Sequence, residues 1–132
     1  MTTYVRRQIN VSVAENQNQS DLIFSRGGSE VKYNADDALA EAEMLKYDIP
    51  IPATDKDLME GSTISVGRIL FIETDTEIVV KLDNTGDTGF TVKPVNSSTR
   101  GVLYLEGNFT HVYVSVAGTS GNANVVAGIV GA

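Results

Sequence analysis

The 132-residue sequence has no cysteine, no tryptophan and a single histidine, His111. Without cysteine, the chain can form neither disulfides nor thiolate zinc sites. One histidine excludes any mechanism that needs two from the same chain. The sequence also lacks the roughly 18 uninterrupted apolar residues of a membrane-spanning helix, and its first residues, MTTYVRRQINV, lack the apolar run of a signal peptide. We therefore expect a protein made and used in solution, without a cofactor.

Basic residues are few as well, with 10 Lys and Arg against 17 Asp and Glu, which gives a net charge of −7. Such a chain is a poor candidate for nonspecific nucleic-acid binding, because neutralising phosphates requires Lys and Arg. The charge is uneven along the sequence. Residues 1–33 carry four basic and three acidic residues, a sum of +1, whereas residues 34–132 carry six basic and fourteen acidic ones, a sum of −8. The two parts could face different surroundings, although basic residues on a solvated surface are the simpler interpretation.

What the sequence has in abundance is short β signals. Apolar residues recur at every second position in some segments, and other segments are apolar runs of strand length separated by loops rich in Gly, Asn, Asp and Ser. The predicted strands lie at 5–13, 21–25, 63–73, 78–82, 90–94, 101–107, 108–116 and 123–130. About eight short strands at regular spacing predict an all-β fold, a single β-sandwich or jelly-roll-like domain, with a barrel as the open alternative.

Three local features refine this prediction. Gly67, inside a predicted strand, indicates a β-bulge. The tripeptide Glu106-Gly107-Asn108 indicates a tight hairpin turn between two strands. In the strand that follows this turn, alternation places Val112, Val114 and Val116 on one face, which we expect to be buried.

One segment predicts a helix instead. Residues 34–47, NADDALAEAEMLKY, begin with Asn34 as a candidate N-cap and carry acidic residues in the first turn, where the helix dipole favours anions. Ala38, Ala42 and Leu45 would share one helix face. That apolar face is thin, so we expect a short helix that lies on a surface.

The chain therefore divides into three parts in this interpretation. Residues 1–33 form an N-terminal strand or arm region, and residues 61–132 form the β-sandwich body. Between them, residues 34–60 combine the helix with an extended stretch enforced by Pro50 and Pro52. A connection of this length usually has a task, such as reaching a neighbouring subunit.

Candidates for metal binding are weak. Glu73, Asp75 and Glu77 alternate in sequence, so in an extended chain their carboxylates could converge on calcium. A second acidic loop holds Asp83 and Asp87 beside Asn84. Neither group matches an EF-hand loop, so we interpret both as solvated turns of an acidic protein and expect no metal.

Candidates for catalysis are weaker still. His111 would need an oriented partner and a nucleophile to act as a general base, and the sequence has no G-x-S-x-G nucleophile elbow. We expect His111 to be a strand residue flanked by Phe109 and Tyr113. We therefore predict that the protein is not an enzyme.

The second half of the chain resembles a known class of viral proteins. Its segments RILFIETDTEIVVKLDNTGDTGFTVKP, residues 68–94, and GVLYLEGNFTHVYVSVAGTSGNANVVAGI, residues 101–129, are similar in layout and composition to β-sandwich head proteins of tailed bacteriophages, of the decoration or cement kind. In such proteins a strand rich in Leu, Tyr and Glu leads into the pattern G-x-x-T-x-V-x-V and a final short Val/Ala strand. The resemblance covers about half of the chain.

This resemblance implies a structural virion protein on the capsid exterior, which stabilises a phage head by binding at junctions of the major capsid protein. It implies many copies, often homotrimers, without catalysis and without nucleic-acid or membrane partners. Two alternatives stay open: another virion component, such as a head–tail adaptor, tail tube or tail tip, and a ligand- or carbohydrate-binding β-sandwich module. The lack of tryptophan counts against the module, although Tyr104 and Tyr113 could stack on a sugar.

The sequence also suggests which residues contact other subunits. The candidates are Arg6, Arg7, Arg26, Val125, Val126, Ile129 and Val130. The arginines belong to the N-terminal part, whose charge differs in sign from that of the remainder. The valines and isoleucine belong to the last strand, which is apolar on both faces, and a strand of that kind is normally covered on both sides. We therefore predict that another subunit covers part of this strand.

Overall fold

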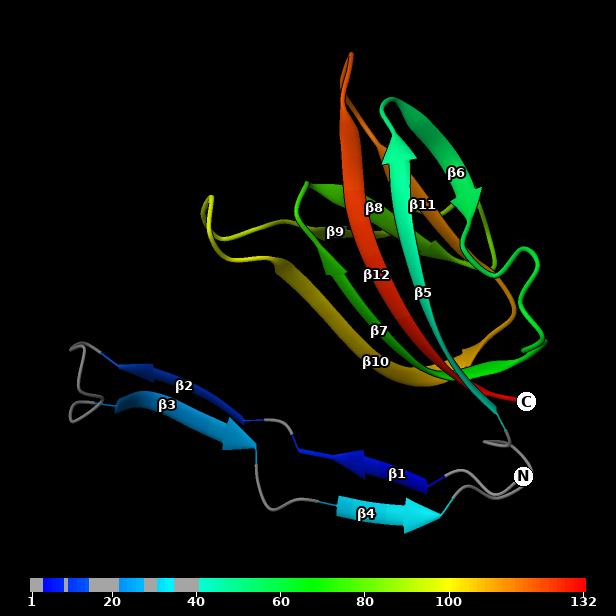
Figure 1. Cartoon of the computed structure of the whole chain (residues 1–132). Helices are drawn as coiled ribbons and strands as arrows, with labels where there is room; N and C mark the ends of the chain where they lie inside the picture. Colours follow the sequence, from blue (N-terminus) through cyan, green and yellow to red (C-terminus); the bar gives the residue numbers. More distant parts are fainter. Residues whose placement is uncertain (1–3, 9, 15–21, 28–30, 35–40) are drawn as a thin grey trace.

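The computed structural model describes the chain at residues 4–8, 10–14, 22–27, 31–34 and 41–132 (Figure 1). These residues form strands, turns and loops and contain no helix, so the all-β prediction is confirmed for them. Consistently, the described residues include no helix with the length and apolar composition needed to cross a bilayer.

The N-terminal residues form two antiparallel ladders, one nested inside the other in sequence. Strand β1 (Tyr4–Arg7) pairs with β4 (Val31–Asn34), and β2 (Asn10–Ala14) pairs with β3 (Leu22–Gly27). Each of the two ladders is a two-stranded sheet. We call strands β1–β4 the N-terminal ribbon, which Figure 1 draws in blue and cyan.

Residues 41–132 form the body of the molecule, with eight strands in two four-stranded antiparallel sheets. The first sheet has the order β10-β7-β12-β5 and the second sheet has the order β6-β11-β8-β9. The strands are β5 (Glu41–Pro50), β6 (Ala53–Asp57), β7 (Gly67–Thr74), β8 (Ile78–Leu82), β9 (Phe90–Val92), β10 (Gly101–Phe109), β11 (Val112–Val116) and β12 (Asn122–Gly131).

Strand pairing in the body is nested from the outside inward. The first strand, β5, pairs with the last, β12, and within that pair β6 pairs with β11, β7 with β10 and β8 with β9. Two further ladders, β12 with β7 and β11 with β8, join these pairs into the two sheets. Successive pairs therefore alternate between the sheets, and β12 lies inside the first sheet between β5 and β7.

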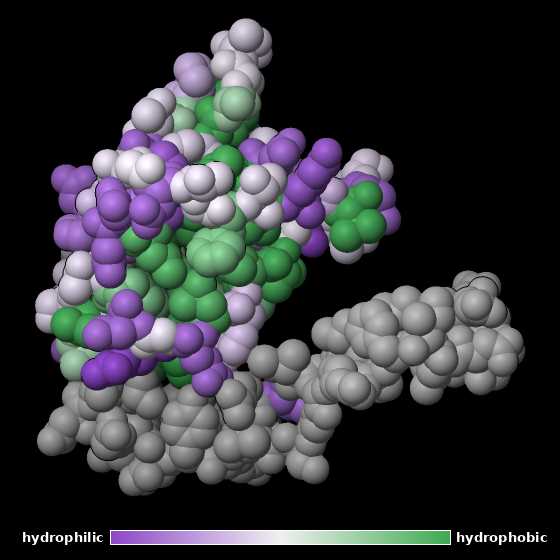
Figure 2. All heavy atoms as spheres, turned by 180° about the vertical axis from the view of Figure 1, so that it is seen from behind, coloured by the Kyte–Doolittle hydropathy of each residue, from purple (hydrophilic) through white to green (hydrophobic). Residues whose placement is uncertain are grey.

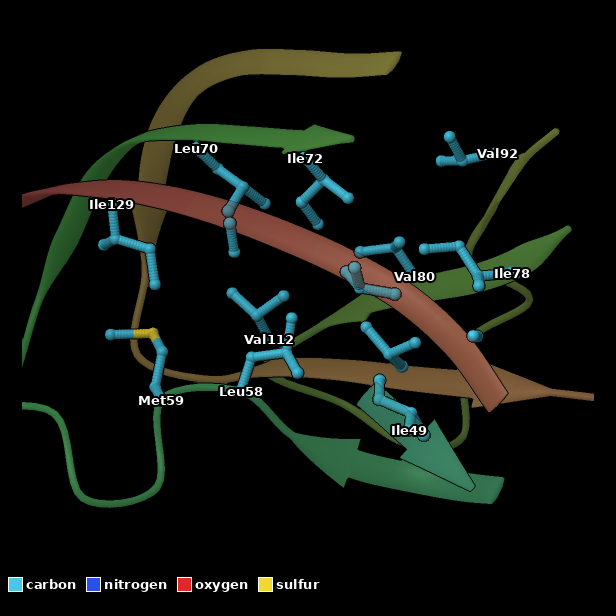
Figure 3. Packing of buried hydrophobic residues seen from close by; sticks show 14 of the residues in the cluster. Ile49, Leu58, Met59, Leu70, Ile72, Ile78, Val80, Val92, Val112 and Ile129 are labelled. Atoms are coloured by element: carbon cyan, nitrogen blue, oxygen red, sulfur yellow. The ribbon is translucent and has the colours of Figure 1, made fainter. Parts of the chain in front are cut away.

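Both sheets contribute to one hydrophobic core, and Figure 3 shows their side chains pointing toward one another. The residues of β11 and β12 that alternate onto the core side are buried: Val112, Val114, Val116, Val125, Ala127 and Ile129. The predicted burial of the three β11 valines is thus confirmed. Burying a side chain of this kind contributes about 1.5–3 kcal/mol relative to leaving it exposed, so these two strands account for much of the core's stabilisation.

The segment between β6 and β7 closes one end of the core with Leu58, which is 0% exposed (Figure 3). Its following residues are tied to β5 through Glu43, whose carboxylate accepts hydrogen bonds from the Ser62 hydroxyl at 2.9 Å and the Thr63 backbone N–H at 3.0 Å. The Thr63 hydroxyl also donates to Glu43, and this bond is the main reason that the pKa of Glu43 lies below its ordinary value.

The predicted helix at 34–47 is wrong wherever the structure describes that segment; residues 35–40 lie outside the described residues. Asn34 ends β4, and residues 41–47 belong to β5. Leu45 packs against the core while Ala42 is exposed, so they lie on opposite sides of a strand. The ten-residue ladder with β12 overrides the helix propensity of this Ala- and Glu-rich segment.

The interpretation of 34–60 as a connection is corrected by the same observation. Strands β5 and β6 are the edge strands of the first and second sheets, so residues 41–57 supply structure to the body. Their partners, β12 and β11, are more than fifty residues further along the chain, which is why local sequence patterns do not reveal the pairing.

The predicted hairpin turn at Glu106-Gly107-Asn108 is also wrong, because β10 continues through it to Phe109 with a register irregularity. Strands β10 and β11 belong to different sheets. The bulge expected at Gly67 is confirmed, since both ladders of β7 shift register next to this residue. A Cβ at Gly67 would lie 2.2 Å from the ring of Phe109, so glycine permits the ring to pack directly on the backbone.

Candidate interaction surface

The outward side of the first sheet is unusually apolar. Its register aligns side chains in rows across the four strands, and one row consists of Tyr104, Phe71, Gly128 and Met44. We call this surface the outer apolar face. It comprises Ala42, Met44, Ile69, Phe71, Val102, Tyr104, Val126, Gly128 and Val130.

Exposure confirms that this face is a surface. Met44 is 71% exposed and Val102 is 55% exposed, at opposite edges of the sheet, while Val126 and Val130 between them are half-buried. Antiparallel sheets with one solvated side normally place polar residues on that side. Contiguous exposed apolar residues mark interaction sites more often than they mark ordinary surface.

One end of this sheet is held in place by a polar network. The Arg100 guanidinium donates to the side-chain oxygen of Asn124 at 2.7 Å, and the Asn124 side-chain amide donates to Asp48 at 2.9 Å. The backbone N–H of Asn124 donates to Asp75 at 2.9 Å. These bonds connect β5, β12 and two loops, so the outer apolar face lies on a preorganised sheet.

The four β12 residues singled out by the sequence separate into two pairs. Val126 and Val130 lie on the outer apolar face, where an additional subunit could cover them. Val125 and Ile129 are 0% exposed within the chain's own core, so they have no surface to offer a partner. The cover of Val126 and Val130 by another subunit stays a prediction.

The three arginines lie in the N-terminal ribbon. Arg6 and Arg7 belong to β1, where Arg6 occupies the position paired with Lys32. Arg26 belongs to β3, opposite Val11 of β2. The structure thus assigns all three to the two-stranded part of the chain, apart from the four-stranded sheets.

The carboxylates proposed for calcium do not form a cluster. Glu73 lies on the outward side of β7, while Asp75 and Glu77 follow in the next turn. Asp75 already accepts a hydrogen bond from the Thr76 hydroxyl at 2.8 Å as well as the one from Asn124. Across the residues that the structure describes, no three His, Cys, Asp or Glu side chains are grouped to hold a metal ion.

The second acidic loop is organised by its own side chains. The Asn84 side-chain oxygen accepts from the Gly86 N–H at 2.9 Å, and its amide donates to Asp87 at 3.3 Å. Asp83 accepts from the backbone N–H of Thr110 at 2.6 Å and of His111 at 2.8 Å. Burial raises the pKa of Asp83, but these hydrogen bonds outweigh it and hold the pKa below its ordinary value.

His111 lies in the turn between β10 and β11, so its predicted place within a strand is corrected. Its Nδ1 is 2.8 Å from an Asp57 carboxylate oxygen, and its ring stacks on Tyr113 with centroids 5.5 Å apart. The histidine therefore has an oriented carboxylate partner that sequence reasoning did not identify. Within residues 41–132 no hydroxyl hydrogen-bonds to this ring, and the pair joins β6 to the turn.

A second apolar feature lies at the open side of the body between the edge strands β9 and β10. Phe90 pairs with the buried Val80, which places it on the core side of the second sheet, yet it is 52% exposed. Leu103 and Leu105 of β10 are partly buried against the same core. Figure 2 shows hydrophobic side chains gathered in the middle of the face seen from behind.

No known family model matches this sequence, and no curated protein is significantly similar to it.

Proposed function

We propose that the protein is a structural component of a phage virion, a capsid decoration (cement) protein that forms homotrimers and binds at junctions of the major capsid protein. The observation that carries the proposal is the outer apolar face, a wide hydrophobic surface on a strongly acidic all-β body. It is combined with the resemblance of residues 68–94 and 101–129 to proteins of this kind.

The strand order supports a more specific architecture. In a jelly roll, eight strands pair first with last and so inward, and successive pairs alternate between two stacked sheets. The nested pairing from β5/β12 to β8/β9 agrees with this scheme, and we infer that the body is a jelly-roll β-sandwich. Jelly rolls occur in viral capsid proteins, and also in lectins and cupins. The fold therefore favours a virion role without deciding it.

The character of the surface favours a protein partner over a small ligand. Small-molecule sites are concave, with a few converging polar groups, whereas the outer apolar face is the side of a sheet. Tyr104 and Tyr113, the candidate sugar platform, belong to β10 and β11 in different sheets. The ring of Tyr113 is already stacked on His111. These observations favour the cement role over the carbohydrate-binding module.

Cosedimentation with phage heads tests the proposal. Heads assembled from the capsid protein encoded beside this chain would be mixed with the purified protein, and bound copies counted by quantitative mass spectrometry. We expect saturation at hundreds of copies per head. Six or twelve copies would indicate a ring component such as a head–tail adaptor, and no binding would overturn the capsid role.

A further inference from the structure

We propose that the N-terminal ribbon of one copy docks on the outer apolar face of a second copy, so that subunits associate head to tail. The inference rests on the homo-oligomer of the proposed function, but not on its attachment to a capsid. It commits to one occupant of the face, namely strands β1–β4 of another copy.

The ribbon requires cover. Its ladders are two-stranded, and an isolated two-stranded hairpin is marginally stable in water. In both ladders, alternate cross-strand pairs combine apolar residues with one another or with arginine. These pairs are Val5/Tyr33, Arg7/Val31, Val11/Arg26 and Val13/Phe24. The intervening pairs include Arg6/Lys32 and Ser12/Ser25. Because paired residues occupy the same side of a ladder, each ladder has one side suited to an apolar surface.

The receiving face is open and of matching length. Met44 and Val102 are 71% and 55% exposed with the whole chain counted, so the copy's own ribbon leaves them uncovered. Strands β5 and β12 are each 10 residues long, which corresponds to about 33 Å. Strands β1 and β2 together span a similar number of residues. A ribbon from a second copy could therefore lie along the full length of the sheet.

Charge favours the same pairing. The first 33 residues sum to +1, whereas the remainder sums to −8. The like-charged pair Arg6/Lys32 in the ribbon would be relieved beside acidic residues such as Glu73 on the outward side of β7. Opposite charges of this kind guide association and suppress wrong partners. Contact between two different surfaces of identical chains is heterologous, and such contacts generate closed rings when the rotation closes. The contact is therefore compatible with a homotrimer.

The first test is the mass of the full-length protein in solution, measured by sedimentation velocity over a range of concentrations. Met44→Glu and Val102→Glu would place a charge on the docking face, and Val95→Glu is the matched control because Val95 is 84% exposed in a loop outside it. We expect at least tenfold weaker self-association for the two face variants and none for the control. Unchanged urea midpoints of the separated chains would show that all three fold normally.

The second test identifies the occupant. Lys32 in β4 is the single lysine before Lys46, which lies exposed in β5 beside the outer apolar face. An equimolar mixture of ¹⁴N- and ¹⁵N-labelled protein would be treated with an amine cross-linker and analysed by mass spectrometry. We expect Lys32–Lys46 links that join one light and one heavy peptide.

Three results would overturn the inference: a monomer at every concentration, association unaffected by either face variant, or links formed within single chains alone. Loss of head binding by a protein that still forms mixed links would instead contradict only the capsid role.

Discussion

At the scale of single residues, Gly67 shows how closely the body is packed. A Cβ there would lie 2.2–2.8 Å from three ring atoms of Phe109, which is itself 1% exposed and cannot turn outward. We expect Gly67→Ala to lower the free energy of unfolding by about 1–3 kcal/mol, the usual cost of overpacking a core. Urea unfolding measures the change.

Gly128 provides the matched control for this prediction. It lies in β12, where an added Cβ would meet the Phe71 Cβ at 3.8 Å, an ordinary van der Waals distance. Gly128→Ala should therefore change the free energy of unfolding by less than about 0.5 kcal/mol. Equal effects of the two alanine variants would contradict the close packing of Phe109 on Gly67.

Asp83 makes a residue-scale contribution that depends on pH. Its folded-state pKa is lowered, because hydrogen bonds from Thr110 and His111 outweigh the effect of burial. A depressed carboxylate pKa stabilises the fold above the unfolded pKa, near 3.9, and this stabilisation is lost as pH falls through the folded pKa. We expect Asp83→Asn to cost about 1 kcal/mol at pH 7, a value discounted because the side chain is exposed.

The measurement is urea unfolding of the variant and the wild type between pH 7 and pH 2. The difference between them should shrink as the pH falls below the pKa of Asp83. Asp87→Asn is the control, because Asp87 accepts one hydrogen bond, from the Asn84 side chain at 3.3 Å. A difference that stays constant down to pH 2 would show that ionised Asp83 does not secure the turn.

At the scale of elements, β5 separates what the sequence predicts from what it does not. Alternation alone identified the buried residues of β11, because Val112, Val114 and Val116 face the core with more polar neighbours between them. In β5, residues such as Ala42 and Glu43 favour a helix, and their strand conformation depends on a partner about eighty residues away. Long-range pairing overrode the local preference, as it often does for residues of moderate propensity.

The same element explains which surface residues were missed. Val126 and Val130 were predicted because their strand is apolar on both faces. Met44 was not, because the segment that contains it was interpreted as a helix, and Val102 has a single exposed apolar side chain in its part of β10. The exposed position of Met44 next to the half-buried Leu45 would have been a signal only if β5 had been recognised as a strand.

Adjacent positions in β5 test this assignment. Met44 is 71% exposed and Leu45 packs against the core, so a strand predicts opposite outcomes for the same substitution. We expect Leu45→Glu to lower the free energy of unfolding by about 2 kcal/mol or more, since it brings a charge against apolar side chains. Met44→Glu should change it by less than about 0.5 kcal/mol.

Urea unfolding, at a concentration low enough for single copies to prevail, measures both variants. Comparable losses at the two positions would mean that residues 44 and 45 are equally covered, which is incompatible with an edge strand whose successive side chains alternate between core and solvent.

At the scale of the whole molecule, strand order lay beyond what periodicity can predict. Eight strands and an all-β class followed from the spacing of apolar segments, but the pairing of β5 with β12 joins the first and last strands of the body. That pairing depends on the complete set of strands, and no local pattern encodes it. Such non-local topology also delays folding, because loop closure must precede the contacts that reward it.

The position of β12 leads to a prediction for the whole molecule. It lies between β7 and β5 and is the sole strand partner of β5 among the described residues. It also contributes Val125, Ala127 and Ile129 to the core, all 0% exposed. A chain that ends at residue 121 should therefore lose cooperative unfolding and the dispersed amide resonances of a folded protein.

Strand complementation makes this prediction sharper. A synthetic peptide of residues 122–132, added to the truncated chain, should restore cooperative unfolding and resonance dispersion because it can fill the vacant position beside β5 and β7. A peptide with Val125→Asp and Ile129→Asp should fail, since these residues face the core, whereas Val126→Asp should still restore the fold because Val126 lies on the outer apolar face. A truncated chain that folds unaided would contradict the central place of β12, and equal rescue by all three peptides would contradict the assignment of its two sides.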